Sequence, residues 1–591
     1  MTAFATPLVI LLGSAAILLV AYFTYGSLLA RLFGLRASAP MPSETLRDGV
    51  DYEPTPPSYL LGQHLSAIAA AGPIVGPILA GVAFGWLPAL LWIIVGCIFL
   101  GGVHDLGSLV ASVRHRAKSI AEVVREHVSG RAFLLLLVFI YIALIYIIVA
   151  FTDIVAASFV DVVTLEDGTR VLGSGIASSS LLYLLLAMAM GVVLRRTRIS
   201  LTAATAIFLP LVGASIWAGQ RIPFDLEQWT GLSPVGTTRL WGALLLGYCL
   251  VAGAAPLWLL LQPRGHLGGW FLYIALFGGV LGLVIGSITG SDVIRYPAFV
   301  PFDERGVGAS AIAPILFITI ACGACSGFHC LIASGTTSKQ LRRETDAKAI
   351  GYGAMLIEGM IAIVSLACVM VITRESARGM QPNAIYAAGI GRFVATLGVP
   401  ATIAVSFALL AFTTFVYDTL DVCTRLGRFI VQELTGLTGR AGRWLGTAVT
   451  AGVPLIFLFT TPLGPDGAPM PAWRLFWSLF GASNQLLAAL ALLGITAWIW
   501  RTRRAWWIWP VAGVPMLFMY TMSGWALFSF VRQGFAAVLE SGSASDLPSS
   551  PVPWAALVLI GLAAALAIEG LLAFVRPVRL PHSDAAHSVS A

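Results

Sequence analysis

Long, uninterrupted apolar runs dominate this sequence. Each reaches about twenty residues, the length that an α-helix needs to cross a bilayer. Only 11% of the residues are charged, whereas soluble domains carry roughly 25%. The runs are continuous rather than alternating, so helices are favoured over a barrel of strands. We therefore expect an all-α fold, a polytopic membrane helix bundle of about 15 transmembrane helices. The predicted spans are 7–30, 60–83, 86–112, 132–160, 176–194, 199–218, 240–262, 267–290, 310–335, 350–373, 399–424, 445–461, 474–500, 505–530 and 552–575.

Charge in the connections predicts the orientation of the bundle. Alternate loops are rich in Arg and Lys, as in 114–118, 195–198 and 501–504, and the loops between them carry Asp and Glu instead. Basic loops stay on the cytoplasmic side, so we expect the N-terminus outside and the C-terminus inside. These loops also explain the net charge of +7, so no nucleic-acid partner is implied.

Two of the predicted spans are interrupted. The segment Ile318–Lys339 begins as an apolar helix and then meets Gly323, Ser326 and Gly327. In Ala67–Leu79, the pairs Gly72-Pro73 and Gly76-Pro77 loosen the helix twice and remove two backbone donors. Unwound backbone is tolerated inside a bilayer where it is buried in protein or lines a cavity. Both breaks are therefore candidates for the binding site of a secondary transporter.

The order of the spans gives the two interrupted segments opposite directions, as an inverted repeat requires. A five-plus-five repeat with extra helices and a seven-plus-seven repeat both fit. We expect residues 1–59 to form a first transmembrane helix and a cytoplasmic loop, residues 60–580 the core that holds both breaks, and residues 581–591 a disordered polar tail.

Ionisable residues inside apolar spans need a reason, because each costs roughly 2.5–3.5 kcal/mol at a helix centre. His104 and Asp105 are adjacent in the third span, and Glu358 lies inside another. A histidine beside a carboxylate holds a proton near neutral pH, so these three residues are candidate proton carriers. Two structural alternatives remain open. The His104–Asp105 pair is close enough in sequence to order the cytoplasmic helix end against Arg114 or Arg116. Glu358 is a candidate partner for a distant arginine.

Asp418 and Asp421 are three residues apart and share one helix face. Asp421 has Arg425 four residues later, which is the spacing of an ordinary ion pair, so we expect a structural role for it. Asp418 has no partner nearby in the sequence and is a further candidate proton carrier.

Polar residues near the second break are candidates for substrate contacts. Ser326 and His329 lie within or just after the break, and Asn484 and Gln485 place amide groups inside another apolar span. The alternative for each residue is packing or a hydrogen bond between helices, worth about 1 kcal/mol.

The cysteines Cys322, Cys325 and Cys330 do not predict a metal site. Zinc usually needs four ligands, and thiolates inside a membrane are costly. Small residues that let helices approach closely are the better interpretation. We expect no metal and no cofactor, and the sequence offers no clustered nucleophile and base that would indicate an enzyme.

Seven blocks of sequence, spread from Gly62 to Leu490, carry a family resemblance. They are GQHLSAIAAAGPIVGPILA, FGWLPALLW, GGVHDL, PILFITIACGACSGFHCLIASGTTSKQL, IGYGAMLIEG, DTLDVCTRLGRFIVQEL and LFGASNQLLAAL. In this order they resemble the carbon starvation protein A (CstA) family of bacterial inner-membrane transporters. The resemblance implies a LeuT-like inverted-repeat core, similar to that of the amino-acid/polyamine/organocation transporters. It also implies uptake of peptides during carbon starvation, or of pyruvate with protons.

These features predict a proton-coupled importer of a small carboxylated nutrient, pyruvate or short peptides, in the bacterial cell inner membrane. Half-helix N-termini carry about half a unit of positive charge and are expected to hold the substrate carboxylate. Gly72, Gly76, Gly323 and Gly327 would let backbone amides approach it. The main alternative is a membrane nutrient sensor that binds the same ligand without net transport. A channel would need a ring of pore-lining carbonyls or charges.

Overall fold

The computed structural model describes residues 6–48, 52–164, 168, 170–255, 258–304, 311–437, 439–460, 470–543 and 547–575. The predicted tail, 581–591, lies outside the described residues. The described part is helical apart from one two-stranded antiparallel ribbon, in which β1 (Val162–Thr164) pairs with β2 (Arg170–Leu172).

Thirteen helical segments of the described chain are long and apolar enough to cross a membrane, and one bent pair makes a fourteenth. These segments, together with the two helical halves of the predicted span 310–335, confirm the helical membrane bundle. The continuous spans are α1–α2 (Pro7–Phe23, Tyr25–Phe33), α6–η1–α7 (Trp86–Gly96, Cys97–Gly101, Gly102–Arg114), α9 (Gly130–Ser158), α10 (Gly173–Arg196), α11 (Leu201–Gly219), α13 (Pro234–Ala254), α14 (Leu261–Thr289), η4–η5–α17 (Glu344–Asp346, Lys348–Gly353, Ala354–Met370), α20 (Ala401–Thr435), α21 (Gly439–Phe459), α22 (Ala472–Arg503), η6–α23 (Trp509–Gly513, Val514–Gly534) and α25 (Pro551–Val575). The shorter elements are α3 (Pro42–Thr45), α8 (Ile120–His127), α12 (Leu226–Thr230), η2 (Phe302–Glu304), η3 (Thr337–Lys339), α18 (Arg374–Ala377), α19 (Pro382–Ala395) and α24 (Ala536–Ser541).

The first interrupted span consists of α4 (Pro57–Ile68) and α5 (Gly72–Phe84), which are bent by 48° across the unwound residues 69–71. The sequence places the loosening at Gly72-Pro73 and Gly76-Pro77, and this position is wrong. Pro73 lies in the first turn of α5, where a missing N–H removes no helical hydrogen bond. Gly76 and Pro77 lie inside the continuous helix.

The second interrupted span consists of two short helices, α15 (Ile312–Thr319) and α16 (Phe328–Gly335). Residues 320–327 between them are not helical. This stretch contains Gly323, Ser326 and Gly327, so the predicted position of the second break is confirmed.

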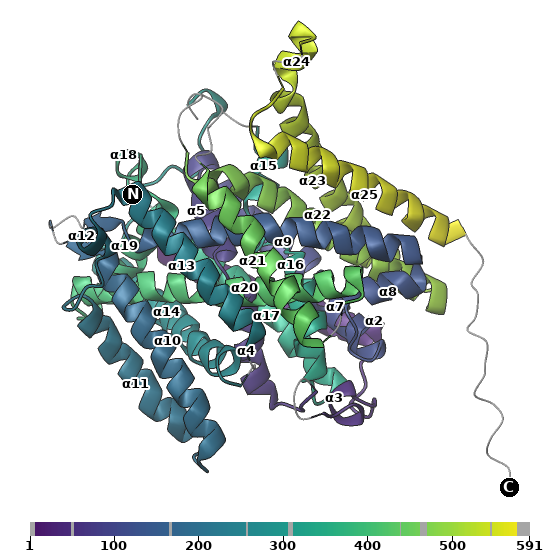
Figure 1. Cartoon of the computed structure of the whole chain (residues 1–591), viewed down its shortest axis with the longest axis horizontal. Helices are drawn as coiled ribbons and strands as arrows, with labels where there is room; N and C mark the ends of the chain where they lie inside the picture. Colours follow the sequence, from purple (N-terminus) through teal and green to yellow (C-terminus); the bar gives the residue numbers. More distant parts are fainter. Residues whose placement is uncertain are drawn as a thin grey trace.

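The middle of the bundle is formed by α16, α17, α20 and α22. Figure 1 shows α16, α17 and α20 near the centre, with α10 and α11 along one edge and α23 and α25 along another. Burial agrees with this arrangement: the most apolar part of α22 is 100% buried, whereas that of α11 is 33% buried. Both interrupted spans therefore lie where protein, not lipid, surrounds them.

One end of the bundle gathers basic residues, and we call it the basic end. Arg114 at the end of α7 pairs with Glu344 of η4 at 2.6 Å. Arg501 near the end of α22 donates to the backbone oxygen of His127 in α8 at 3.0 Å. These contacts bring the ends of α7, α8 and α22 together with the segment that follows α16.

Candidate functional site

Four ionisable side chains form a continuous chain in the core. His104 Nδ1 lies 2.7 Å from one oxygen of Asp105, and the other oxygen of Asp105 lies 2.8 Å from His329 Nδ1. On the far side of this second imidazole, Nε2 lies 3.2 Å from Oε2 of Glu358. The four side chains come from α7, α16 and α17, and each is fully buried. We call them the histidine–carboxylate chain.

The sequence predicts these residues separately, three as proton carriers and His329 as a substrate contact. The structure brings all four together immediately after the second break. The alternative in which the His104–Asp105 pair orders the helix end against Arg114 or Arg116 is wrong, because both oxygens of Asp105 bond to imidazoles and Arg114 pairs with Glu344.

Hydrogen bonding restricts where protons lie in the chain. Asp105 is ionised when it accepts from two imidazoles, so both histidines carry hydrogen on Nδ1. Nε2 of His104 has no hydrogen-bond partner, which suits a neutral ring with a bare lone pair. Nε2 of His329 faces Glu358, so one proton can lie on either group. The His329–Glu358 contact is thus a part of the chain where no hydrogen bond fixes the position of a proton.

Helix α22 holds the second break through Asn484 and Gln485. Asn484 Oδ1 accepts the N–H of Phe328 at 2.8 Å, and the Asn484 carbonyl accepts the N–H of Gly327 at 3.0 Å. The amide of Asn484 donates to Ser326 Oγ at 3.0 Å, and that of Gln485 donates to a carbonyl of α15 at 2.6 Å. These bonds satisfy backbone groups that a helix end leaves without partners. In this conformation Ser326, Asn484 and the amide nitrogen of Gln485 are therefore bonded within the protein, whereas Oε1 of Gln485 has no hydrogen-bond partner.

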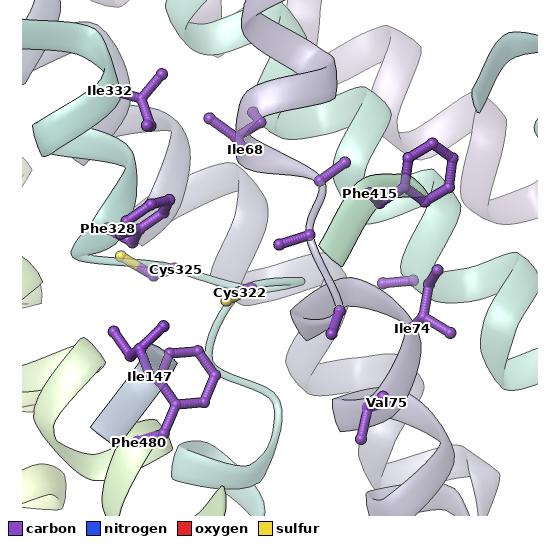
Figure 2. Close-up of a cluster of buried hydrophobic side chains, with 14 of the residues drawn as sticks. Ile68, Ile74, Val75, Ile147, Cys322, Cys325, Phe328, Ile332, Phe415 and Phe480 are labelled. Carbon is purple, nitrogen blue, oxygen red and sulfur yellow. The ribbon is translucent and has the colours of Figure 1, made fainter. Parts of the chain in front are cut away.

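The two breaks pack directly against each other. A Cβ added to Gly72 would collide with the side chain of Cys322, and one added to Gly76 would lie 2.5 Å from the carbonyl oxygen of Thr319. Figure 2 shows the Cys322–Cys325 stretch passing between α16 and the start of α5. The glycines predicted to admit substrate thus permit close helix contact in this conformation.

The remaining two glycines contact other helices in the same way. A Cβ on Gly323 would lie 2.7 Å from the side chain of Ala362 in α17. A Cβ on Gly327 would lie 2.5 Å from the backbone nitrogen of Ala488 in α22.

A second buried cluster surrounds Arg264 of α14. Its Nε donates to Asp418 at 2.6 Å, and its Nη2 pairs with Asp421 at 2.5 Å. Tyr248 of α13 bonds to both Arg264 and Asp421, and Ser66 of α4 donates to Asp418 at 2.9 Å. The predicted spans 240–262 and 267–290 leave Arg264 in the connection between them, and this placement is wrong, because Arg264 lies inside α14. Asp418 has no partner nearby in the sequence, as predicted, since Arg264 is 154 positions away. The arginine side chain is only 1% exposed, inside the first turns of α14.

The direct ion-pair partner of Asp421 is Arg264 and not the predicted Arg425, which acts on Asp421 only electrostatically. Arg264 reaches Asp421 from the neighbouring helix, while Arg425 donates to the carbonyls of Ala252 and Ala255. The i, i+4 spacing predicts a local contact, but the carbonyls at the end of α13 are acceptors for Arg425 that the sequence does not reveal.

A small cavity of about 30 Å³ lies on the basic side of the two breaks. It is lined by Ser66 and His64 of α4, by Thr337, and by Asp418. A space of this size holds a water molecule. It adjoins a wider pocket of about 410 Å³ that reaches Lys339, and the two share Gln63 and Thr336 in their walls. Asp418, a predicted proton carrier, therefore lines the smaller and deeper of two neighbouring cavities.

Another pocket, of about 370 Å³, lies toward the other end of α9, where Asp153 and Asn383 line it. Asp153 accepts the N–H of Trp473 at 2.9 Å. The described conformation thus has pockets toward both ends of the bundle and two closed breaks between them.

Among the described residues, His115, Glu126 and His127 have donor atoms close enough together to share a metal ion. Their ligand atoms lie within 4.8 Å of one another at the basic end. The Nε2 atoms of the two histidines lie 2.8 Å apart, the distance of a direct hydrogen bond. The cysteines of the second break are buried free thiols.

Residues 6–386 and 375–526 match the family described as "Carbon starvation protein CstA". The chain is 31% identical over 532 residues to "Peptide transporter CstA" of Bacillus subtilis (strain 168), covering 82% of this chain and 84% of that protein. It is 30% identical over 601 residues to "Pyruvate/proton symporter BtsT" of Escherichia coli (strain K12), covering 88% and 81%. Among solved structures, MhsT in complex with L-phenylalanine superposes with a TM-score of 0.46 at 11% identity, covering 88% of this chain and 97% of that one. That overlap is too loose for residue correspondences, so the LeuT-like inverted repeat stays a prediction.

Proposed function

Because the chain belongs to the carbon starvation protein CstA family, we propose that it is a secondary transporter that imports a small carboxylated nutrient together with protons. Relatives of this chain are named as a peptide transporter and as a pyruvate/proton symporter, so pyruvate and short peptides are the proposed substrates. A role in the response to carbon starvation is part of the proposal.

The histidine–carboxylate chain is the observation that carries the proton coupling. With Asp105 and Glu358 ionised and His329 protonated, the group has a net charge of −1, and one more proton makes it neutral. A buried net charge is costly, so the group has a physical reason to take up that proton. Because His329 lies on the half-helix that follows the second break, movement of this half-helix would change the surroundings of the proton.

For substrate to enter, the contacts of the second break with the first break and with α22 would have to separate, because they are closed in the described conformation. The N–H groups at the start of α16 now bond to Asn484. A carboxylate is a competing acceptor for such N–H groups, because a helix N-terminus favours negative charge. We propose that Gly72, Gly76, Gly323 and Gly327 line the space that opens. One bundle would then rock against the other around this space, so that it faces each side in turn.

The proposed location is the bacterial inner membrane, with the basic end in the cytoplasm, N-out and C-in. In this orientation the pocket of about 410 Å³, which shares Gln63 and Thr336 with the cavity that Asp418 lines, would face the cytoplasm. Asp418 then remains a proposed proton carrier beside the histidine–carboxylate chain.

Uptake by purified protein in proteoliposomes tests this function. Labelled pyruvate and labelled di- and tripeptides are offered with the outside more acidic than the inside, and again without a gradient. We expect one of these solutes to accumulate only under the gradient. A nutrient sensor would bind the solute, raising the melting temperature of the protein, without accumulating it in the vesicles.

A further inference from the structure

His64 is a buried imidazole with one ring nitrogen that has no hydrogen-bond partner. It lies in α4 one turn before the first break and is 1% exposed. Its Nδ1 lies 2.8 Å from the hydroxyl oxygen of Thr337, and its Nε2 has no hydrogen-bond partner.

The hydrogen bond to Thr337 favours one tautomer of His64. If Nδ1 carries the hydrogen, it donates to the Thr337 hydroxyl and Nε2 presents a bare lone pair. In the other tautomer a buried N–H would have no acceptor, which costs about 1–3 kcal/mol. Nε2 of His64 is therefore a proton acceptor that is already desolvated and held in place.

His64 lines the cavity at the inner side of the basic end, and its helix packs against two helices of the histidine–carboxylate chain. This cavity, of about 30 Å³, shares the wall residues Gln63 and Thr336 with the pocket of about 410 Å³ that reaches Lys339. Helix α4 packs against α16, which carries His329, and against α17, which carries Glu358. Asp418 is the other ionisable group that lines the same cavity.

We propose that His64 is the group through which the histidine–carboxylate chain exchanges its proton with water at the basic end. The inference rests on the proposed function and adds the path by which the proton leaves. A proton passes from the His329–Glu358 pair to Nε2 of His64, which becomes an imidazolium. His64 then gives the proton to water in the cavity and returns to its neutral form, so no other reactant is needed.

Such a role predicts different effects of His64 on two transport modes, net import and solute exchange. Net import requires that the proton be released inside on each cycle, so it requires His64. Exchange of internal for external solute can run with the protein protonated throughout, so it does not require release. A residue that only stabilises the fold would affect both modes alike.

The test is His64→Gln in proteoliposomes, with net uptake under a pH gradient and solute exchange at equal pH measured in parallel. Glutamine can still hydrogen-bond to Thr337 but cannot carry a proton. We expect net uptake to fall about tenfold or more, while exchange stays within about twofold of the wild type. His64→Asn provides a second variant with the same readouts if the first does not fold.

His266→Gln is the matched control. His266 of α14 makes the same kind of contact, with its Nε2 2.7 Å from the hydroxyl of Thr205, but it does not line the cavity. We expect this variant to retain both modes.

Two results would overturn the role of His64: wild-type net uptake in both His64 variants, or an equal loss of net uptake and exchange. These results leave proton-coupled import by the wild type in place. If instead the wild type shows no uptake that depends on the gradient, the proposed function fails and His64 has no coupling role.

Discussion

Replacing Gly327 with alanine tests how tightly the second break is held against α22. Gly327 has φ −66° and ψ −26°, which any residue adopts without strain, so the substitution acts only through space. The new Cβ would meet the backbone nitrogen of Ala488 at 2.5 Å and the Cβ of Leu487 at 2.6 Å, and it would also collide with the Asn484 carbonyl.

The expected cost follows from what the Cβ meets. Two of the three contacts are backbone atoms of a buried helix, which cannot turn aside as a flexible side chain can. Overpacking of this kind costs about 1–3 kcal/mol. The Gly327 N–H bond to Asn484, now 3.0 Å, would also lengthen, which adds about 1 kcal/mol. We therefore expect Gly327→Ala to destabilise the protein by about 2–4 kcal/mol.

Gly335→Ala is the matched control, because Gly335 lies at the other end of α16 and a Cβ there meets only Leu426 at 3.6 Å. Alanine is favoured over glycine in a helix by up to about 1 kcal/mol, so this variant should be neutral or slightly more stable. The assay is thermal unfolding of both purified variants in one detergent. Equal melting temperatures for Gly327→Ala and the wild type would refute the packing described here.

Three further predictions concern charged groups. Arg264→Met leaves Asp418 and Asp421 buried without their cation, so it should lower the free energy of unfolding by about 3–5 kcal/mol. Adding Asp418→Asn and Asp421→Asn to this variant should restore part of the lost melting temperature. If the melting temperature is not restored, the ion cluster is contradicted. Asp105→Asn should abolish uptake driven by a pH gradient, because an amide cannot accept from both imidazoles as a carboxylate does; undiminished gradient-driven uptake would exclude Asp105 from coupling. Burial, aided by the neighbouring His115 and Arg501, lowers the pKa of His127 to about 4 from an ordinary value near 6.5. The fold therefore resists protonation of His127, so stability should decline as pH falls from 6.5 toward 4, and His127→Gln should show a smaller decline in melting temperature between pH 7 and pH 5.

Much of the architecture follows from the sequence, because bilayer thickness fixes the length of an apolar span. The second break was predictable since Gly323, Ser326 and Gly327 all fall within a few residues. The first break was harder to place. A Gly-Pro pair marks either the end of one helix or the first turn of the next, and Pro73 takes the second role.

The histidine–carboxylate chain shows what the sequence could not reveal. Each of its members is conspicuous as an ionisable residue in an apolar span, but Asp105 and His329 are 224 positions apart. Their contact depends on how α7 packs against α16, which no local pattern encodes. Arg264 was missed for a related reason: hydropathy alone does not distinguish an arginine in a short loop from one buried beside two carboxylates.

The proposed mechanism requires that solute and proton cross the membrane together, with the proton carried by the histidine–carboxylate chain. Its most direct test is proton movement driven by solute alone, in proteoliposomes that contain a trapped pH dye and have no imposed gradient. We predict that adding the transported solute acidifies the interior when the wild type is present, and that Glu358→Gln abolishes this acidification. Entry of solute through the wild type with no change in internal pH would contradict the account.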